Sequence, residues 1–123
     1  MTVQVLGAPS EAAATVVART IATSPLTKTA VHGRDPNWGR IVMAVGKSGA
    51  AADRDSLSIR FADVLVAEKG WVAESYEEAD GAAVMRSDEI TIHVDIGLAN
   101  GCCTVWTCDL TQGYISINAD YRS

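Results

Sequence analysis

The chain has 123 residues, with 10 lysines and arginines against 15 aspartates and glutamates, so its net charge near pH 7 is −5. Hydrophobic residues make up 48% of the sequence, which excludes a chain that is disordered by composition. The basic residues are scattered, whereas nucleic-acid binding needs clustered positive charge. No apolar run approaches the roughly 20 residues that cross a bilayer, and no secretory signal is evident. We therefore expect a cytoplasmic protein with no nucleic-acid or membrane partner.

The first third of the chain predicts a strand and then a helix. Val3 and Val5 alternate with polar neighbours before a turn at 7–9, which is typical of a short strand. Ser10 can cap a helix that runs to about Thr23, and the following Ser24-Pro25 ends it. One face of this helix is predicted to carry the apolar side chains Ala13, Val16, Val17 and Ile21.

A second helix is predicted between residues 35 and 46. Asp35 suits the N-cap, Pro36 suits the first helical position, and Gly46 suits the C-terminal stop. Between them, apolar residues recur at helical spacing at Trp38, Ile41, Val42 and Val45.

The second half of the chain predicts strands around a further helix. Leu57, Ile59 and Phe61 alternate as a strand, and residues 64–66 read as its partner after a tight turn. Ser75 and Glu78 form a capping box, which predicts a helix from about residue 76 to residue 85. The clearest strand in the sequence carries Ile90, Ile92, Val94 and Ile96 in strict alternation.

The end of the chain predicts a hairpin and a short helix. Asn100-Gly101 is a strong hairpin pattern, with residues 103–108 as the returning strand. Leu110, Tyr114, Ile117 and Tyr121 have helical spacing, whereas residues 114–117 also suit a short strand; we favour a short helix with a bound, ordered end. No repeat or linker divides the chain, so residues 1–123 are predicted to form one α+β domain, with helices packed on a mixed sheet.

Several candidate catalytic or metal sites are weak. Thr2 would be an N-terminal nucleophile if Met1 were removed, but the residues after it continue as an ordinary strand, and we interpret it as the exposed start of an edge strand. His32, in a glycine-flanked loop, and His93, on a strand face, form no credible catalytic set. Gly46-Lys47-Ser48 is not a phosphate loop, because the glycine that the pattern requires is replaced by Ile41.

The three cysteines are Cys102, Cys103 and Cys108. Their spacing contains no C-x-x-C pattern, so a metal site is disfavoured, and their odd number does not suit a disulfide scaffold. We expect buried, reduced cysteines that act as small hydrophobic residues. Redox or metal sensing through them is a weaker hypothesis.

Two segments remain as binding candidates. Residues 35–41 are explained mainly as a capped helix start, although the helix amides with Arg34 or Arg40 offer a minor anion site. In the tail, Asn118 carries an amide donor and a carbonyl acceptor, which suit the ammonium or carboxylate of an amino acid, and Ser123 adds a hydroxyl. The alternative for the tail is a surface segment that Tyr121 anchors.

Four motifs together carry a resemblance to a known family. They occur in order, at fitting separations: Ser24-Pro25-Leu26-x-Lys28-Thr29-Ala30, Asp35-Pro36-Asn37-Trp38-Gly39-Arg40, Trp106-Thr107-Cys108-Asp109-Leu110-Thr111 and Asn118-Ala119-Asp120-Tyr121-Arg122-Ser123. From about Val3 to Ser123 the chain resembles the C-terminal part of the second (β) chain of ornithine acetyltransferase.

That resemblance implies an enzyme of arginine biosynthesis that moves an acetyl group from N-acetylornithine to glutamate. In the family a precursor cleaves itself ahead of a threonine, which becomes the nucleophile and forms an acyl-enzyme. The family's substrate contacts near the C-terminus fall on Asn118 and Ser123; many members end in threonine, and serine keeps the hydroxyl. The nucleophile and the oxyanion-hole residues belong to upstream segments, so the resemblance assigns no catalytic residue to this chain.

The resemblance also sets expectations for cofactors and partners. It implies no cofactor and no metal, with N-acetylornithine, ornithine and glutamate as ligands. It implies association with the upstream part of the enzyme, in an oligomer such as a heterotetramer, and no acetyl transfer by this chain alone. The alternative is a non-catalytic amino-acid-binding or assembly module derived from that enzyme.

Overall fold

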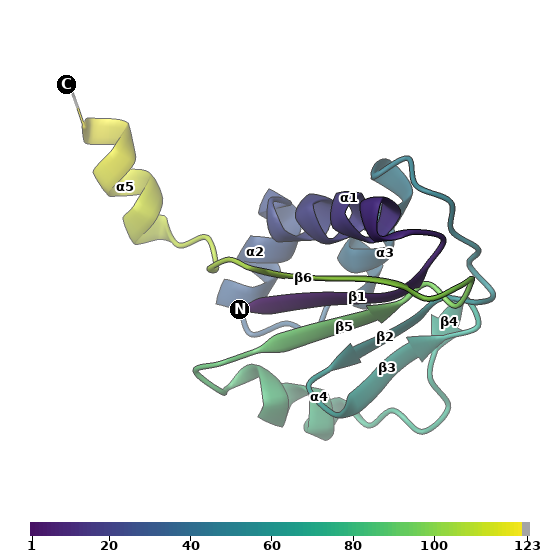
Figure 1. The fold of residues 1–123 in the computed structure, drawn as a ribbon. Coiled ribbons are helices and arrows are strands. Elements are labelled where there is room, and N and C mark those ends of the chain that lie inside the picture. The colour runs from purple at the N-terminus through teal and green to yellow at the C-terminus, as the bar shows by residue number, and fades with distance from the viewer. Residues whose placement is uncertain (122–123) are drawn as a thin grey trace.

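The computed structural model describes residues 1–121 and shows a six-stranded mixed sheet with helices packed on it (Figure 1). The strands are β1 (Thr2–Ala8), β2 (Ser58–Phe61), β3 (Val64–Glu68), β4 (Trp71–Val72), β5 (Thr91–Asp95) and β6 (Gly101–Trp106). The helices are α1 (Glu11–Ala22), α2 (Pro25–His32), α3 (Trp38–Lys47), α4 (Glu78–Met85) and α5 (Gln112–Asp120). The predicted α+β class with a mixed sheet is confirmed. Within residues 1–121 no helix is long and apolar enough to cross a membrane.

The strand order β4-β3-β2-β5-β1-β6 corrects two predictions about β1 and β6. Strand β1 runs parallel to β5 and antiparallel to β6, so it is an interior strand and not an edge. The predicted hairpin at Asn100-Gly101 is therefore wrong, because β1 lies between the two strands that the hairpin would pair. The connection crosses the end of β1 instead, where the backbone N–H groups of Leu98 and Ala99 both donate to the Gly7 carbonyl at 2.8 Å.

The core lies between the sheet and the helices. Val3, Val5, Ile92 and Val94 are fully buried on the helix side of the neighbouring interior strands β1 and β5. Figure 1 shows α1 lying along β1 and β6. Alternation in β2 and β5 placed their apolar faces correctly, and the antiparallel pairing of β2 with β3 is confirmed. The two-residue strand β4 is too short to leave a periodic pattern.

Helix α1 has the predicted bounds but a shifted buried face. Ser10 caps it through Oγ, which accepts from the Ala13 N–H at 3.1 Å, and Thr23 ends it. Val16 of the predicted stripe is 46% exposed. The buried face consists of Ala14, Val17, Ala18, Ile21 and Ala22. Alanines bring the helix axis close to the sheet, and a search for large apolar residues overlooks them.

The sequence patterns do not predict helix α2, because Ser24-Pro25 indicates the end of α1. The same two residues also start a helix: Ser24 Oγ accepts from the Thr27 N–H at 3.3 Å, and Pro25 occupies the first turn. His32 is consequently the last residue of a helix and does not lie in a loop.

The ends of α3 differ from the prediction. Asn37, and not Asp35, is the N-cap, since its Oδ1 accepts from the Arg40 N–H at 3.0 Å. Gly46 lies inside the helix, and the chain turns away at Gly49, whose φ of +76° suits glycine.

Helices α4 and α5 complete the described chain. The capping box predicted for α4 is absent, because Glu77 holds the N-cap position without a side-chain hydrogen bond. The predicted short helix at the end of the chain is confirmed as α5, which Thr111 caps by accepting from the Tyr114 N–H at 3.0 Å.

Candidate functional site

Three of the four motif segments meet around α2. This helix is itself the first motif, residues 24–30. The second motif contacts it through Arg40, and the third, which begins at the last residue of β6, contacts it through Asp109 and Leu110. The fold therefore brings together residues as distant in sequence as His32 and Asp109, which are 77 positions apart.

Arg40 joins the first motif to the second. Its Nη1 donates to the Leu26 carbonyl oxygen at 2.8 Å and to Thr29 Oγ1 at 3.3 Å. The guanidinium is thus used within the chain, which weakens the minor hypothesis that Arg40 assists an anion site at the start of α3. Arg34 is also engaged, since its Nη1 donates to the Arg86 carbonyl at 3.1 Å.

The third motif joins α2 from the other side. The Leu110 N–H donates to the Lys28 carbonyl at 3.2 Å. His32 Nδ1 lies 3.2 Å from Asp109 Oδ2, and both side chains are about half exposed. The Met1 amine donates to the Thr107 carbonyl at 2.7 Å, so the start of β1 is held at the same place. The polypeptide that leads into α5 is therefore fixed against α2.

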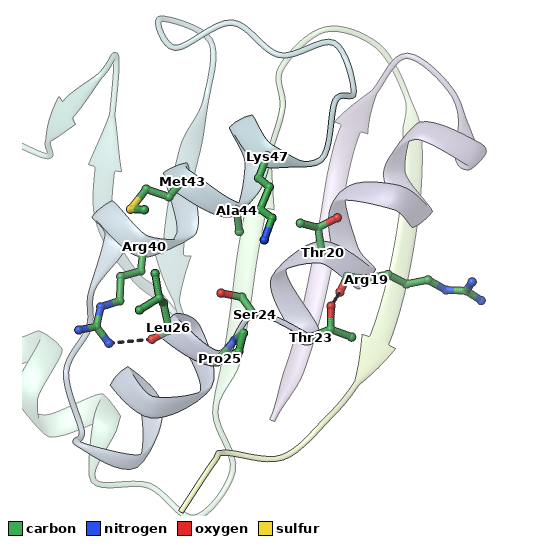
Figure 2. Close-up of a pocket in the computed structure, with 10 residues that line it drawn as sticks. All are labelled: Arg19, Thr20, Thr23, Ser24, Pro25, Leu26, Arg40, Met43, Ala44 and Lys47. Atoms are coloured by element: carbon green, nitrogen blue, oxygen red, sulfur yellow. Dashed lines mark hydrogen bonds between the residues drawn. The ribbon is translucent and has the colours of Figure 1, made fainter.

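A cavity of about 490 Å³ lies between α1, α2 and α3 beside this junction (Figure 2). Its lining combines hydroxyl, apolar and basic side chains: Arg19, Thr20, Thr23, Ser24, Pro25, Leu26, Arg40, Met43, Ala44 and Lys47. Figure 2 shows Lys47 reaching from α3 toward the cavity, whereas Arg19 points away from it. Among residues 1–121, no acidic side chain lines the cavity, so its chemistry suits a small ligand with an apolar body and a negatively charged end.

The sequence-predicted site residues lie on the tail, outside this cavity. Asn118 is on α5, which is exposed along its described length and projects from the body of the molecule (Figure 1). Its Nδ2 donates to the Tyr114 carbonyl at 2.9 Å, which leaves the carboxamide oxygen free to accept. Ser123 lies outside the described residues.

The remaining candidates from the sequence form no catalytic or metal set. Thr2 is a half-buried residue of an interior strand, and its N–H donates to the Ile90 carbonyl at 2.8 Å. His93 lies on a strand face as predicted, with Nδ1 2.8 Å from Gln4 Oε1. Within residues 1–121, no three histidine, cysteine, aspartate or glutamate side chains gather as metal ligands.

The prediction of buried cysteines is wrong for two of the three. All three are free thiols, and Cys103 is half buried on the helix side of β6. Cys102 and Cys108 are exposed. Alternation along β6 explains Cys102, which points to the opposite face of the sheet.

Sequence reasoning also missed a small hollow beside the second motif. Its lining includes Asp35, Asn37, Tyr76 and Glu78. Burial raises the pKa of the Tyr76 phenol above its usual value, and the nearby carboxylates of Glu78, Asp35 and Asp80 raise it further. The phenol therefore stays protonated and can donate a hydrogen bond across the neutral pH range.

Comparisons with known proteins place these observations in a family. The sequence profile of the ArgJ family matches residues 1–123. The arginine biosynthesis bifunctional protein ArgJ of Ruegeria pomeroyi is 63% identical over 121 residues, which are 98% of this chain and 30% of that protein. The protein of the same name from Zymomonas mobilis is 59% identical over 123 residues, again 30% of its length.

A solved structure agrees. The crystal structure of the arginine biosynthesis bifunctional protein of Bacillus halodurans superposes with a TM-score of 0.91 at 35% identity, covering 98% of this chain and 56% of that chain. The chain thus spans about 30% of the length of the curated relatives it matches.

Proposed function

This chain belongs to the ArgJ family, and on that premise we propose that it is the C-terminal, pocket-building domain of an ornithine acetyltransferase. The family takes part in arginine biosynthesis. Residues 1–123 would act as one domain, and the rest of the enzyme would supply the reacting groups. The earlier resemblance to ornithine acetyltransferase agrees with this family.

The proposed reaction is an acetyl exchange in two steps. A threonine hydroxyl in the other part of the enzyme attacks the acetyl carbonyl of N-acetylornithine, its proton passes to the leaving amine, and ornithine departs. The amine of glutamate then attacks the acyl-threonine ester, and the hydroxyl is restored as N-acetylglutamate forms. The exchange needs neither a cofactor nor a metal, and we place it in the cytoplasm.

The observation that carries the proposal is the junction around α2. Hydrogen bonds from Arg40 and to Lys28 hold three motif segments in one place, and the polypeptide continues from there directly into α5. Three of the four motifs of the resemblance therefore meet at one place in the domain, and the fourth begins on α5. A junction fixed in this way would hold the start of the tail in place, so that the end of the tail could reach a pocket shared with another polypeptide.

Within that pocket we assign two substrate contacts to the tail. The carboxamide oxygen of Asn118 is not used by the Tyr114 hydrogen bond and would accept from the ammonium of the amino-acid substrate. The hydroxyl of Ser123 would donate to the substrate carboxylate. Since α5 projects away from its own domain, its partner surface would belong to the remainder of the enzyme (Figure 1). The proposed assembly is therefore an oligomer that contains this chain, the upstream part of the enzyme and the amino-acid substrates.

The test uses a chimaera in which this chain replaces the matched third of the Ruegeria pomeroyi protein. We expect the chimaera to transfer acetyl from N-acetylornithine to glutamate, and the 123-residue chain alone to show no transfer. Asn118→Ala should raise KM for N-acetylornithine by about tenfold, the cost of one hydrogen bond to a charged group. Asn100→Ala, in the exposed loop before β6, is the matched control and should leave KM unchanged.

Two results would count against the proposal. An inactive chimaera that folds and binds N-acetylornithine would favour the alternative of an amino-acid-binding or assembly module. An active chimaera in which Asn118→Ala behaves like Asn100→Ala would remove the assigned role of the tail.

A further inference from the structure

The two faces of the sheet are covered very differently. On the helix side, Val5, Val94 and Ile59 are at most 1% exposed. Their neighbours on the same strands, which point to the other side, are half buried or exposed. Within residues 1–121, no helix or strand packs over this second face, which we call the open face.

The open face combines apolar and polar side chains in cross-strand rows. One row runs across four strands through Thr104, Gln4, His93 and Arg60, in the observed pairing register. Next to it stand Leu6, 38% exposed, and Trp106, 75% exposed. A hollow of about 550 Å³ opens between β1, β5 and β2, with Leu6, Arg60 and His93 in its lining.

These properties are those of a surface that is covered in the working protein. A tryptophan is rarely left on a sheet face, because burial of its ring is strongly favourable. The Gln4–His93 hydrogen bond at 2.8 Å orders polar groups that would meet a partner in a fixed geometry.

We propose that the open face is the docking surface for the part of the ArgJ polypeptide that lies outside the matched segment. This inference rests on the proposed function. The curated relatives are more than three times as long as the match, and 44% of the Bacillus halodurans chain lies beyond it, as 100% minus the 56% covered. A large amount of polypeptide is therefore available to form the missing layer.

The position of Trp106 supports this occupant over a second copy of the chain. The match lies in the C-terminal part of the relatives, so their preceding polypeptide reaches this fold at the start of β1. There Thr2 pairs directly with Trp106 across the sheet. The preceding polypeptide thus meets the domain beside the most exposed aromatic side chain of the open face.

The test measures whether Cys102, an exposed thiol on the open face, becomes protected in the full-length protein. Variants with Cys102 as the only cysteine are made in the chimaera and in the 123-residue chain, and each is labelled with iodoacetamide under native conditions. The control replaces Cys102 by serine and carries Val16→Cys on the exposed side of α1. We expect labelling of Cys102 to be at least about tenfold slower in the chimaera, while the Val16→Cys thiol changes by less than about threefold.

Acetyl transfer by the same samples separates the two proposals. An active chimaera with unprotected Cys102 overturns the docking surface and leaves the proposed function standing. Protection in an inactive chimaera supports the docking surface and counts against the proposed function. The 123-residue chain is labelled at a concentration at which sedimentation shows a monomer, and equal protection of Cys102 there overturns this inference, because the thiol would then be shielded without the rest of the polypeptide. If the chimaera does not fold, the same measurement is made in the Ruegeria pomeroyi protein with one cysteine at the aligned position.

Discussion

Thr27→Val should raise the free energy of unfolding of the chain by about 1 kcal/mol. Thr27 is 1% exposed, and its Oγ1 has no hydrogen-bond partner among the described residues. The space around it, bounded by Ile41, Phe61 and Ile92 among others, has no volume for a water molecule. A buried hydroxyl without a partner costs about 1–3 kcal/mol, and valine has nearly the same shape and helix propensity. We expect a gain of about 1 kcal/mol, the lower end of this range, because the valine side chain must fit the rotamer that Thr27 adopts.

The assay is thermal and urea unfolding followed by circular dichroism. For a domain of this size, about 1 kcal/mol corresponds to a rise in Tm of about 3–5 °C. Thr29→Val is the control on the same helix. Its hydroxyl donates to the Pro25 carbonyl at 2.8 Å and accepts from Arg40 Nη1 at 3.3 Å, so its loss should lower stability by about 1 kcal/mol. An unchanged or lower Tm for Thr27→Val would refute the reasoning, because it would mean that the native hydroxyl is satisfied.

Three further predictions concern the junction, the end of β1 and the open face. Arg40→Ala should lower the free energy of unfolding in urea by about 1–2 kcal/mol, because its two hydrogen bonds to α2 are lost. The control Arg19→Ala should change this free energy by less than about 0.5 kcal/mol. Equal effects of the two substitutions would mean that the Arg40 hydrogen bonds do not stabilise the junction. Gly7→Ala should lower the free energy of unfolding by more than about 2 kcal/mol in the same assay, because Gly7 has a φ of +66° and a Cβ there would meet the Asp95 side chain. A loss below about 0.5 kcal/mol would contradict this prediction, because it would show that the end of β1 can shift to accept the side chain. The 123-residue chain should self-associate in sedimentation velocity, and Trp106→Ser should weaken that association; an unaltered chain that stays monomeric at all concentrations would disprove it.

Regular alternation was the most reliable guide to the fold. The apolar side chains of β2 and β5 are buried on one face as their period of two predicts, and α5 was predicted from helical spacing. The partner of β6 was not predictable in this way. Asn100-Gly101 encodes a local turn preference, whereas the insertion of β1 between β5 and β6 is a long-range pairing that is stabilised by hydrogen bonds to both neighbouring strands and by burial of Val3 and Val5.

Helix ends were predicted less well than helix positions, for a local reason. Asp35 and Asn37 are both good caps, and the sequence cannot show which one is free to accept. In the structure, the carboxylate Oδ2 of Asp35 accepts from Asn37 Nδ2 at 3.0 Å, while Asn37 Oδ1 accepts from the Arg40 N–H. Asp35 thus orients the side chain of Asn37, and Asn37 caps the helix.

The candidate site shows the same division between local and long-range information. The motifs were recognised as segments, and Asn118 and Ser123 remain predicted contacts that lie on or beyond α5. The place in the fold where the motifs meet was not predicted, because α2, the helix around which they meet, was not predicted. An eight-residue helix is too short to be stable on its own propensity, so α2 exists because Thr27, Ala30 and Val31 are buried against the core.

That dependence has a consequence for function. Because α2 is held by tertiary packing, the carbonyl of Leu26 and the hydroxyl of Thr29 are fixed in space and can in turn fix Arg40. The same helix holds the segment before α5 through the carbonyl of Lys28. A substitution in the core beneath α2 should therefore alter the position of the tail, although the substituted residue makes no contact with the tail. Ala30→Gly, which weakens the helix by about 1 kcal/mol and removes one buried methyl group, should loosen the tail and raise KM in the chimaera. If KM stays constant while stability falls, the tail is positioned by the other polypeptide and not by α2.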